Sequence, residues 1–143
     1  MDELNFAEET TTRMKNLYGL AGSQEVIRRT IISRIYYSAH HLSRYLLRQV
    51  GLRPDTWRRN VHQRVIDEMQ RQFVATNMMN SEVTAFLKDM FASLSDYFVN
   101  RRRNRVKADY QLHLAIRERH VENIFDIFDT YLNECRQLLE VIA

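Results

Sequence analysis

The chain has 143 residues, which is enough for one domain to bury a continuous core without disulfide or metal cross-links. Three glycines and one proline are too few for the many tight turns of a β-sheet fold, so the composition favours helices. The net charge of +3 is modest, but arginine is concentrated in two segments, which suits pairing of the planar guanidinium with phosphate or carboxylate groups.

The first predicted helix covers about residues 4–20, and Gly19 or Gly22 ends it. Its expected core-facing side chains are Phe6, Met14, Leu17 and Tyr18. Ser23 is then the expected N-cap of a long second helix, because its hydroxyl can accept a hydrogen bond from an amide of the first turn. Pro54 lies beyond the end of that helix. Its apolar positions fall on one stripe at helical spacing, namely Ile27, Ile31, Ile35, Leu42 and Leu46.

A loop over residues 52–60 follows the second helix. It carries the single tryptophan among three arginines, namely Arg53, Trp57, Arg58 and Arg59. A third helix is predicted over about residues 61–74, Ser81 can cap a fourth, and a last helix is expected over about residues 106–142. The sequence leaves open whether the last two helices are continuous through residues 101–107.

These helices predict the fold class and the cell compartment. Amphipathic helices joined by short connections pack antiparallel, so we predict a single all-α domain over residues 1–143, an antiparallel up-down bundle of four to five helices. No apolar run approaches the roughly 18 residues that cross a bilayer, and the start of the chain is acidic where a signal peptide is basic. Cys135 is the only cysteine and is expected to be a core thiol, which suits a reducing compartment. We therefore expect a cytoplasmic protein with no membrane partner.

A line of polar side chains is predicted along the second helix. Spacings of four, three and four residues place them on one side of the helix, at the edge of its apolar stripe: Arg34, Ser38, His41 and Tyr45. His40 is expected to point a quarter-turn or more away, so the two adjacent histidines would not share a site. A row of side chains that simply bond to a neighbouring helix explains the same spacing, and both interpretations stay open.

The second candidate is the most basic stretch of the chain. Five of the seven residues from 101 to 107 are basic and none is acidic, so an anion is expected to compensate their repulsion. If a helix starts at Asn104, its exposed amides add to an anion site that suits a phosphodiester. Arg105 and Asp109 are four residues apart and can pair on the helix surface. A solvated charged turn is the alternative. Zinc-binding and phosphate-loop motifs are missing, so neither a metal nor a cofactor is expected.

Taken together, residues 33–47 and residues 105–110 resemble the small stand-alone HEPN proteins, a family named for higher eukaryotes and prokaryotes nucleotide-binding. Members often carry Ser-Arg-x-Tyr-Tyr-x-x-x-His, matched here from Ser33 to His41, followed later by Arg-x-x-Ala-Asp-Tyr, matched from Arg105 to Tyr110. The resemblance covers roughly residues 23–135. It implies a HEPN-like helical bundle, usually a homodimer, that acts as toxin or effector in prokaryotic toxin–antitoxin or defence systems. A small nucleotidyltransferase is often the antitoxin partner.

The resemblance also implies roles for single residues. Active relatives are metal-independent endoribonucleases, and Arg34 with His41 fits their arginine-to-histidine spacing. His41 would then transfer the proton, and Arg34 would stabilise the developing charge. Residues assigned to binding RNA or a nucleotide are Ser38, Tyr45, Arg103, Asn104, Arg105, Asp109 and Tyr110. In better-known members this arginine-to-histidine motif begins Arg-Asn and lies at the start of a later helix; the corresponding stretch here is residues 103–108, with Ala108 in place of the histidine. A catalytically inactive nucleotide-binding or nucleotidyltransferase-docking module therefore stays the alternative to a ribonuclease.

Overall fold

The computed structural model describes residues 2–103 and 117–142, and no strand occurs in those two ranges. The elements in chain order are α1 (Asp2–Ala21), α2 (Glu25–Gln49), the 3-10 helix η1 (Pro54–Thr56), α3 (Val61–Met69), the π-helical turn η2 (Gln70–Val74), α4 (Ser81–Arg103) and α5 (Glu118–Ile142). The predicted all-α class is confirmed. None of the helices in the described ranges is long and apolar enough to cross a membrane.

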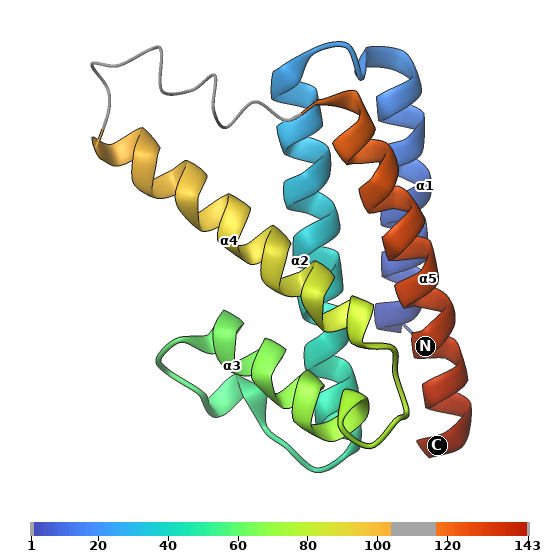
Figure 1. Ribbon diagram of the computed structural model, residues 1–143. Coiled ribbons are helices and arrows are strands. Elements are labelled where there is room, and N and C mark those ends of the chain that lie inside the picture. The colour runs from blue at the N-terminus through green and yellow to red at the C-terminus, as the bar shows by residue number, and fades with distance from the viewer. Residues whose placement is uncertain (1, 104–116, 143) are drawn as a thin grey trace.

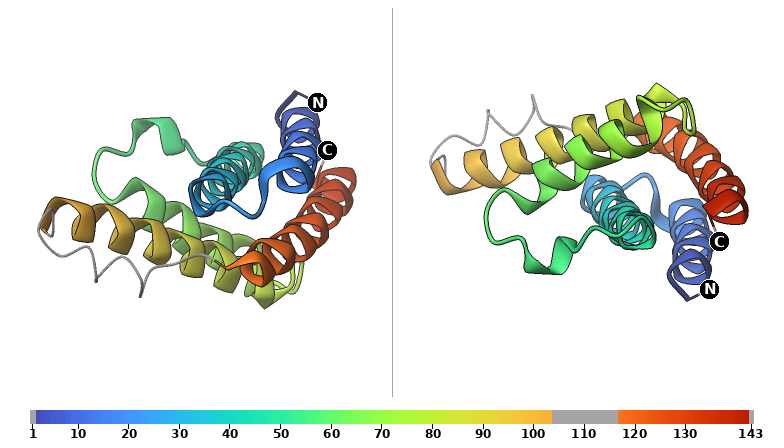
Figure 2. Two further views of the ribbon diagram at one scale, coloured as in Figure 1. Left: turned by 90° about the horizontal axis from the view of Figure 1, so that it is seen from above. Right: turned by 90° about the horizontal axis from the view of Figure 1, so that it is seen from below.

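Three helices lie side by side and form the bundled part of the molecule. Figure 1 shows α1 and α2 running antiparallel, with α5 beside them and running in the same direction as α2. α4 leaves this group obliquely, and α3 crosses near the beginning of α4, as the end-on views also show (Figure 2). The finer assignment, to a HEPN-like up-down bundle, stays a prediction.

The core is built on the predicted apolar stripe of α2. Ile31, Ile35, Leu42 and Leu46 are fully buried, while Ile27 packs against the core from a partly buried position. Helices α4 and α5 add buried aromatic and aliphatic side chains, among them Phe86, Leu87, Phe128, Tyr131 and Leu138. Cys135 is also fully buried, which confirms the expected core thiol.

The first helix faces the core with a different side from the one predicted. Phe6 is 56% exposed, so its predicted burial is wrong. Leu4, Ala7 and Thr11 face the core instead, which lets the helix axes of α1 and α2 approach across small side chains. Met14, Leu17 and Tyr18 pack against the core from partly buried positions.

Helix ends also differ from the prediction. The N-cap of α2 is Gln24, not Ser23, and its side chain makes no capping hydrogen bond. At α4 the capping side chain is that of Asn80, whose Oδ1 accepts a hydrogen bond from the Glu82 amide at 3.0 Å, instead of that of Ser81. α4 continues through Arg103, and α5 begins at Glu118, after the non-helical Arg117, so a helix without interruption from residue 106 is excluded.

Candidate functional site

The predicted polar line on α2 borders the core, and its members differ in exposure. Arg34 and His41 are exposed, Tyr45 is partly buried, and Ser38 is buried with only 3% of its surface accessible. Ser38 Oγ has no hydrogen-bond partner in the described part of the chain. Only the exposed members, Arg34 and His41, are placed where a ligand could reach them directly.

The second predicted candidate cannot be placed beside the first. Asn104, Arg105, Asp109 and Tyr110 lie outside the described residues. Arg103 is the last residue of α4. The predicted Arg105–Asp109 pair and the composite site that would join both segments therefore stay predictions.

A stack of rings connects α2, α3 and α4 next to the polar line. The hydroxyl of Tyr36 lies 2.6 Å from Nδ1 of His62, at the start of α3. The His62 ring stacks on that of His40, with 4.2 Å between centroids, and on that of Phe91, with 5.3 Å. The His40 ring is thus packed between its own helix, α2, and the start of α3.

His40 is buried and His41 is exposed, so the two adjacent histidines have different surroundings, as expected. Their ring centroids are 5.8 Å apart and the rings meet edge to face. The His40 ring stacks on that of His62 at the start of α3, whereas His41 lines a pocket formed by α1, α2 and η1. With His62 they form one cluster of three imidazoles, of which only His41 lines the pocket.

All three imidazoles in this cluster favour their neutral forms. Burial, the largest cause, together with the nearby His62, Arg44 and His41, lowers the pKa of His40 to about 3. The pKa of His62 is lowered by burial and by Arg44 and His41. Burial raises the pKa of the Tyr36 hydroxyl, which stays protonated. His40 and His62 therefore form an uncharged surface beside His41.

His41 itself lines an open pocket of about 490 Å³. The pocket is formed by the beginning of α1, the second half of α2 and η1, and its lining is Asp2, Glu3, Phe6, His41, Arg44, Arg48 and Asp55. Burial lowers the pKa of His41, and Arg44 and Arg48 lower it further. A neutral imidazole beside two guanidiniums can take a proton from a ligand whose negative charge the arginines attract.

The arginines of this pocket are already paired with carboxylates of the same chain. Arg44 forms an ion pair with Asp55, and Arg48 contacts Asp55 at 3.4 Å and Glu3 at 3.6 Å. Asp55 is exposed, so these pairs are accessible to water and weak. An incoming phosphate would compete with Asp55 for the same two guanidiniums.

Sequence reasoning did not identify Arg44, Arg48, Asp55 or His62 as site residues. Arg44 and Arg48 could have been found, because they follow His41 by three and seven residues and so share its side of the helix. His62 and Asp55 reach the site only through the turn of the chain after α2. The structure thus brings His41 together with Arg44 and Arg48, whereas Arg34 does not line the pocket.

The described residues contain no group of three or more histidine, cysteine, aspartate or glutamate side chains that could hold a metal ion. A comparison with protein-family models found no match, and searches of curated proteins and of solved structures found no significant match.

Proposed function

We propose that this chain is an RNA-directed protein of the HEPN type, the toxin or effector of a two-component system, and that it cleaves RNA without a metal ion in the pocket around His41. One observation carries the proposal: an accessible histidine of lowered pKa shares an open pocket with two arginines. The resemblance of residues 33–41 and 105–110 to HEPN motifs supports the choice of RNA.

The proposed reaction needs side chains alone. The neutral imidazole of His41 accepts the proton of a ribose 2′-hydroxyl, and the oxygen then attacks the adjacent phosphorus. Arg44 and Arg48 stabilise the additional negative charge on the phosphate oxygens. The P–O5′ bond breaks, a water molecule protonates the leaving oxygen, and the resulting hydroxide takes the proton from His41. The products are a 2′,3′-cyclic phosphate and a free 5′-hydroxyl, and His41 is neutral again.

We assign Arg34 to a contact with a neighbouring phosphate of the RNA strand. It precedes His41 by seven residues on α2, which is about 10 Å along a helix at a rise of 1.5 Å per residue. A guanidinium at that distance suits the next phosphodiester of the strand better than the one being cleaved. A homodimer that places residues 103–110 of a second chain beside this pocket would complete the site.

The test compares cleavage of total RNA in EDTA by the wild type and by single variants. His41→Ala is expected to lower the cleavage rate by about 10²- to 10⁴-fold because it removes the base. Arg44→Ala is expected to lower it by about 10²-fold or more because the transition state loses a charge partner. His120→Ala removes an exposed histidine at the start of α5 and should leave the rate unchanged. Equal cleavage by all four proteins, or none by the wild type, would contradict the ribonuclease proposal.

The pairing of Asp55 with both arginines favours a second candidate function. If these arginines are neutralised in the free protein, the pocket can be a silent part of a nucleotide-binding or nucleotidyltransferase-docking module. This alternative predicts that RNA stays intact, while calorimetry detects binding of a nucleotide or a nucleotidyltransferase that Arg105→Ala abolishes.

A further inference from the structure

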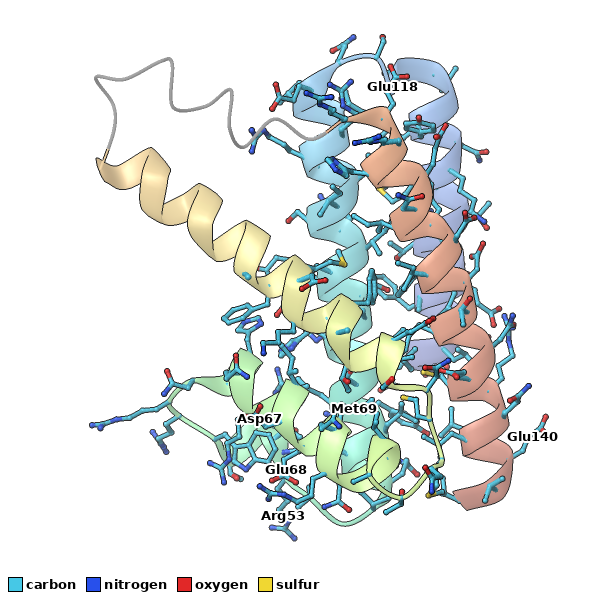
Figure 3. All side chains as sticks on the ribbon, in the orientation of Figure 1. Arg53, Asp67, Glu68, Met69, Glu118 and Glu140 are labelled. Atoms are coloured by element: carbon cyan, nitrogen blue, oxygen red, sulfur yellow. The ribbon has the colours of Figure 1, made fainter. Side chains whose placement is uncertain are left out.

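The loop between α2 and α3 carries a set of exposed arginines that the pocket around His41 does not use. Arg53, Arg58 and Arg59 lie in this loop, and Arg64 follows in the first turn of α3; all four are exposed. The loop projects from the bundled helices at the α3 end of the molecule (Figure 1). Arg53 lies at that end, opposite to Glu118 (Figure 3).

Hydrogen bonds hold the loop in one conformation. Thr56 Oγ1 donates to the Arg53 carbonyl at 2.7 Å, and the Trp57 amide donates to the Pro54 carbonyl at 3.1 Å. Asn60 has a φ of 51°, a left-handed conformation that asparagine tolerates, and it turns the chain into α3. The Trp57 side chain packs against the core. The arginines therefore project from a folded support.

The charge of this surface is not compensated by its neighbours. In the part of the chain that the structure describes, Arg53, Arg58, Arg59 and Arg64 make no ion pair, whereas Asp55 pairs with Arg44 and Arg48. The nearest acids of α3 are occupied as well. Asp67 accepts a hydrogen bond from Gln63, and Glu68 pairs with Arg71. Four guanidiniums on one loop and one helical turn thus have no counterion among the residues whose side chains the structure describes.

An aromatic ring lies within the basic surface. The guanidinium carbon of Arg64 lies 4.3 Å from the centre of the Trp57 ring, so the two groups are in cation–π contact. The exposed Arg64 guanidinium offers a flat surface on which an unpaired base can stack, while the other arginines contact phosphates. Val50, 37% exposed, is the one exposed large hydrophobic side chain at or next to residues 51–64, so a lipid surface would find little apolar area to anchor on here.

The same loop borders the pocket around His41. Asp55, in η1, lines that pocket and contacts both of its arginines. Arg53 lies two positions before Asp55, and Arg58 lies three positions after it. We propose that Arg53, Arg58, Arg59 and Arg64, together with Trp57, form a binding surface for single-stranded RNA that leads the strand into the pocket. This inference rests on the proposed function for the choice of RNA, and its test reads binding without requiring cleavage.

The experiment measures binding of a fluorescent oligouridine of about 16 nucleotides, the upper range of a single-strand site. Its riboses are 2′-O-methylated, so they lack the nucleophile of the proposed reaction. Each phosphate contact to a single strand contributes about 0.7 to the slope of log affinity against log salt, or about fivefold at 0.1 M salt. Arg58→Ala/Arg59→Ala is therefore expected to reduce the slope by about 1.4 and to weaken binding about 25-fold.

A matched control removes the same charge elsewhere. Arg13→Ala/Arg119→Ala replaces two exposed arginines of α1 and α5 and is expected to change affinity by less than about twofold at 0.1 M salt. Arg58→Lys/Arg59→Lys keeps the charge and is expected to retain the slope. Equal weakening by both alanine pairs would overturn the proposal, because total charge would then explain binding. Binding of anionic lipid vesicles without binding of the oligonucleotide would overturn it as well.

The binding experiment and the ribonuclease test can succeed or fail independently of each other. If the wild type cleaves no RNA but Arg58→Ala/Arg59→Ala selectively loses the oligonucleotide, the binding surface stands and the catalytic proposal fails. If the wild type cleaves RNA and the same variant binds and cleaves as well as the wild type, the binding surface is refuted and the catalytic pocket stands.

Discussion

Folding takes the His40 imidazole out of water. The residue is 5% exposed, its ring stacks on that of His62, and its pKa falls to about 3 from an ordinary value of 6.5. The unfolded chain therefore binds a proton near pH 6.5 that the folded chain does not bind until about pH 3. The stability that neutral His40 contributes is full above pH 6.5 and is lost as the pH falls toward 3, by about 2 kcal/mol at pH 5.

Denaturant unfolding at about pH 7.5 and pH 5 measures this loss. Wild type is expected to lose about 2 kcal/mol more between the two pH values than His40→Gln, whose side chain does not titrate. Because the lowered pKa values of His41 and His62 act in both proteins, the difference isolates His40. His120→Gln, on the exposed start of α5, should keep the wild-type loss. An equal loss in wild type and His40→Gln would show that this imidazole is not buried in the neutral form.

Single residues of the site could be predicted only where one helix determines their position. Spacing on α2 predicted His41 as a candidate, and the structure places it on the surface, where it lines a pocket. His62 was not found, because a loop and the start of another helix bring it to His40 and Tyr36. The stacking of His40 on His62 was not found for the same reason: α2 fixes where the His40 Cβ points, but the packing of α3 and α4 fixes where the ring lies.

Among the helices, periodicity predicted the central segments and was less successful at the ends. The stripe from Ile31 to Leu46 is buried as expected because four apolar positions repeat at helical spacing. The start of α2 was misplaced by one residue, since Ser23 and Gln24 are adjacent polar residues and the turn after α1 determines which one takes the extended backbone conformation of a cap. The rotation of α1 depends on its packing against α2, so the sequence of α1 alone did not reveal that Phe6 faces water.

A substitution at the N-cap of α2 can test which residue begins this helix. Gln24 has φ −89° and ψ 126°, the extended geometry of an N-cap, but its side chain makes no capping hydrogen bond. In Gln24→Asp a shorter side chain can accept a hydrogen bond from an amide of the first turn, and its charge interacts favourably with the helix dipole. The expected gain in unfolding free energy is about 0.5 to 1 kcal/mol, measured by denaturant unfolding.

A complementary substitution removes the capping hydrogen bond that Asn80 makes at the start of α4. Asn80→Ala loses the hydrogen bond from the Glu82 amide and is expected to destabilise the protein by about 1 kcal/mol. Ser23→Asp places the same acid one residue earlier and should have a smaller effect than Gln24→Asp. If Ser23→Asp gave the larger gain, the helix would begin where the sequence first suggested.

At the scale of the whole molecule, a buried hydroxyl pair joins two helices that are distant in sequence. Tyr131 of α5 is fully buried; its hydroxyl forms a hydrogen bond with Ser43 Oγ and lies 3.3 Å from the Ala39 carbonyl oxygen of α2. Ser43 Oγ also donates to the Ala39 carbonyl, at 2.8 Å. Because Ser43 keeps this second partner, removal of the Tyr131 hydroxyl loses hydrogen bonding between α2 and α5 without leaving a hydroxyl donor unpaired.

Cys135 lies one turn after Tyr131, and the rate at which its thiol is labelled can measure how much the loss of this hydrogen bonding destabilises the core. Burial raises the pKa of its thiol, and the residue is fully buried, so a thiol reagent can reach the sulfur only when the core opens. When closing is faster than labelling, the labelling rate follows the population of the open state. Tyr131→Phe should cost about 1 to 1.5 kcal/mol and so accelerate labelling about five- to tenfold. Tyr37→Phe, which removes a hydroxyl from an exposed tyrosine of α2, should leave the rate within about twofold. Equal labelling rates in wild type and Tyr131→Phe would mean that the core opens at Cys135 without separating α2 from α5.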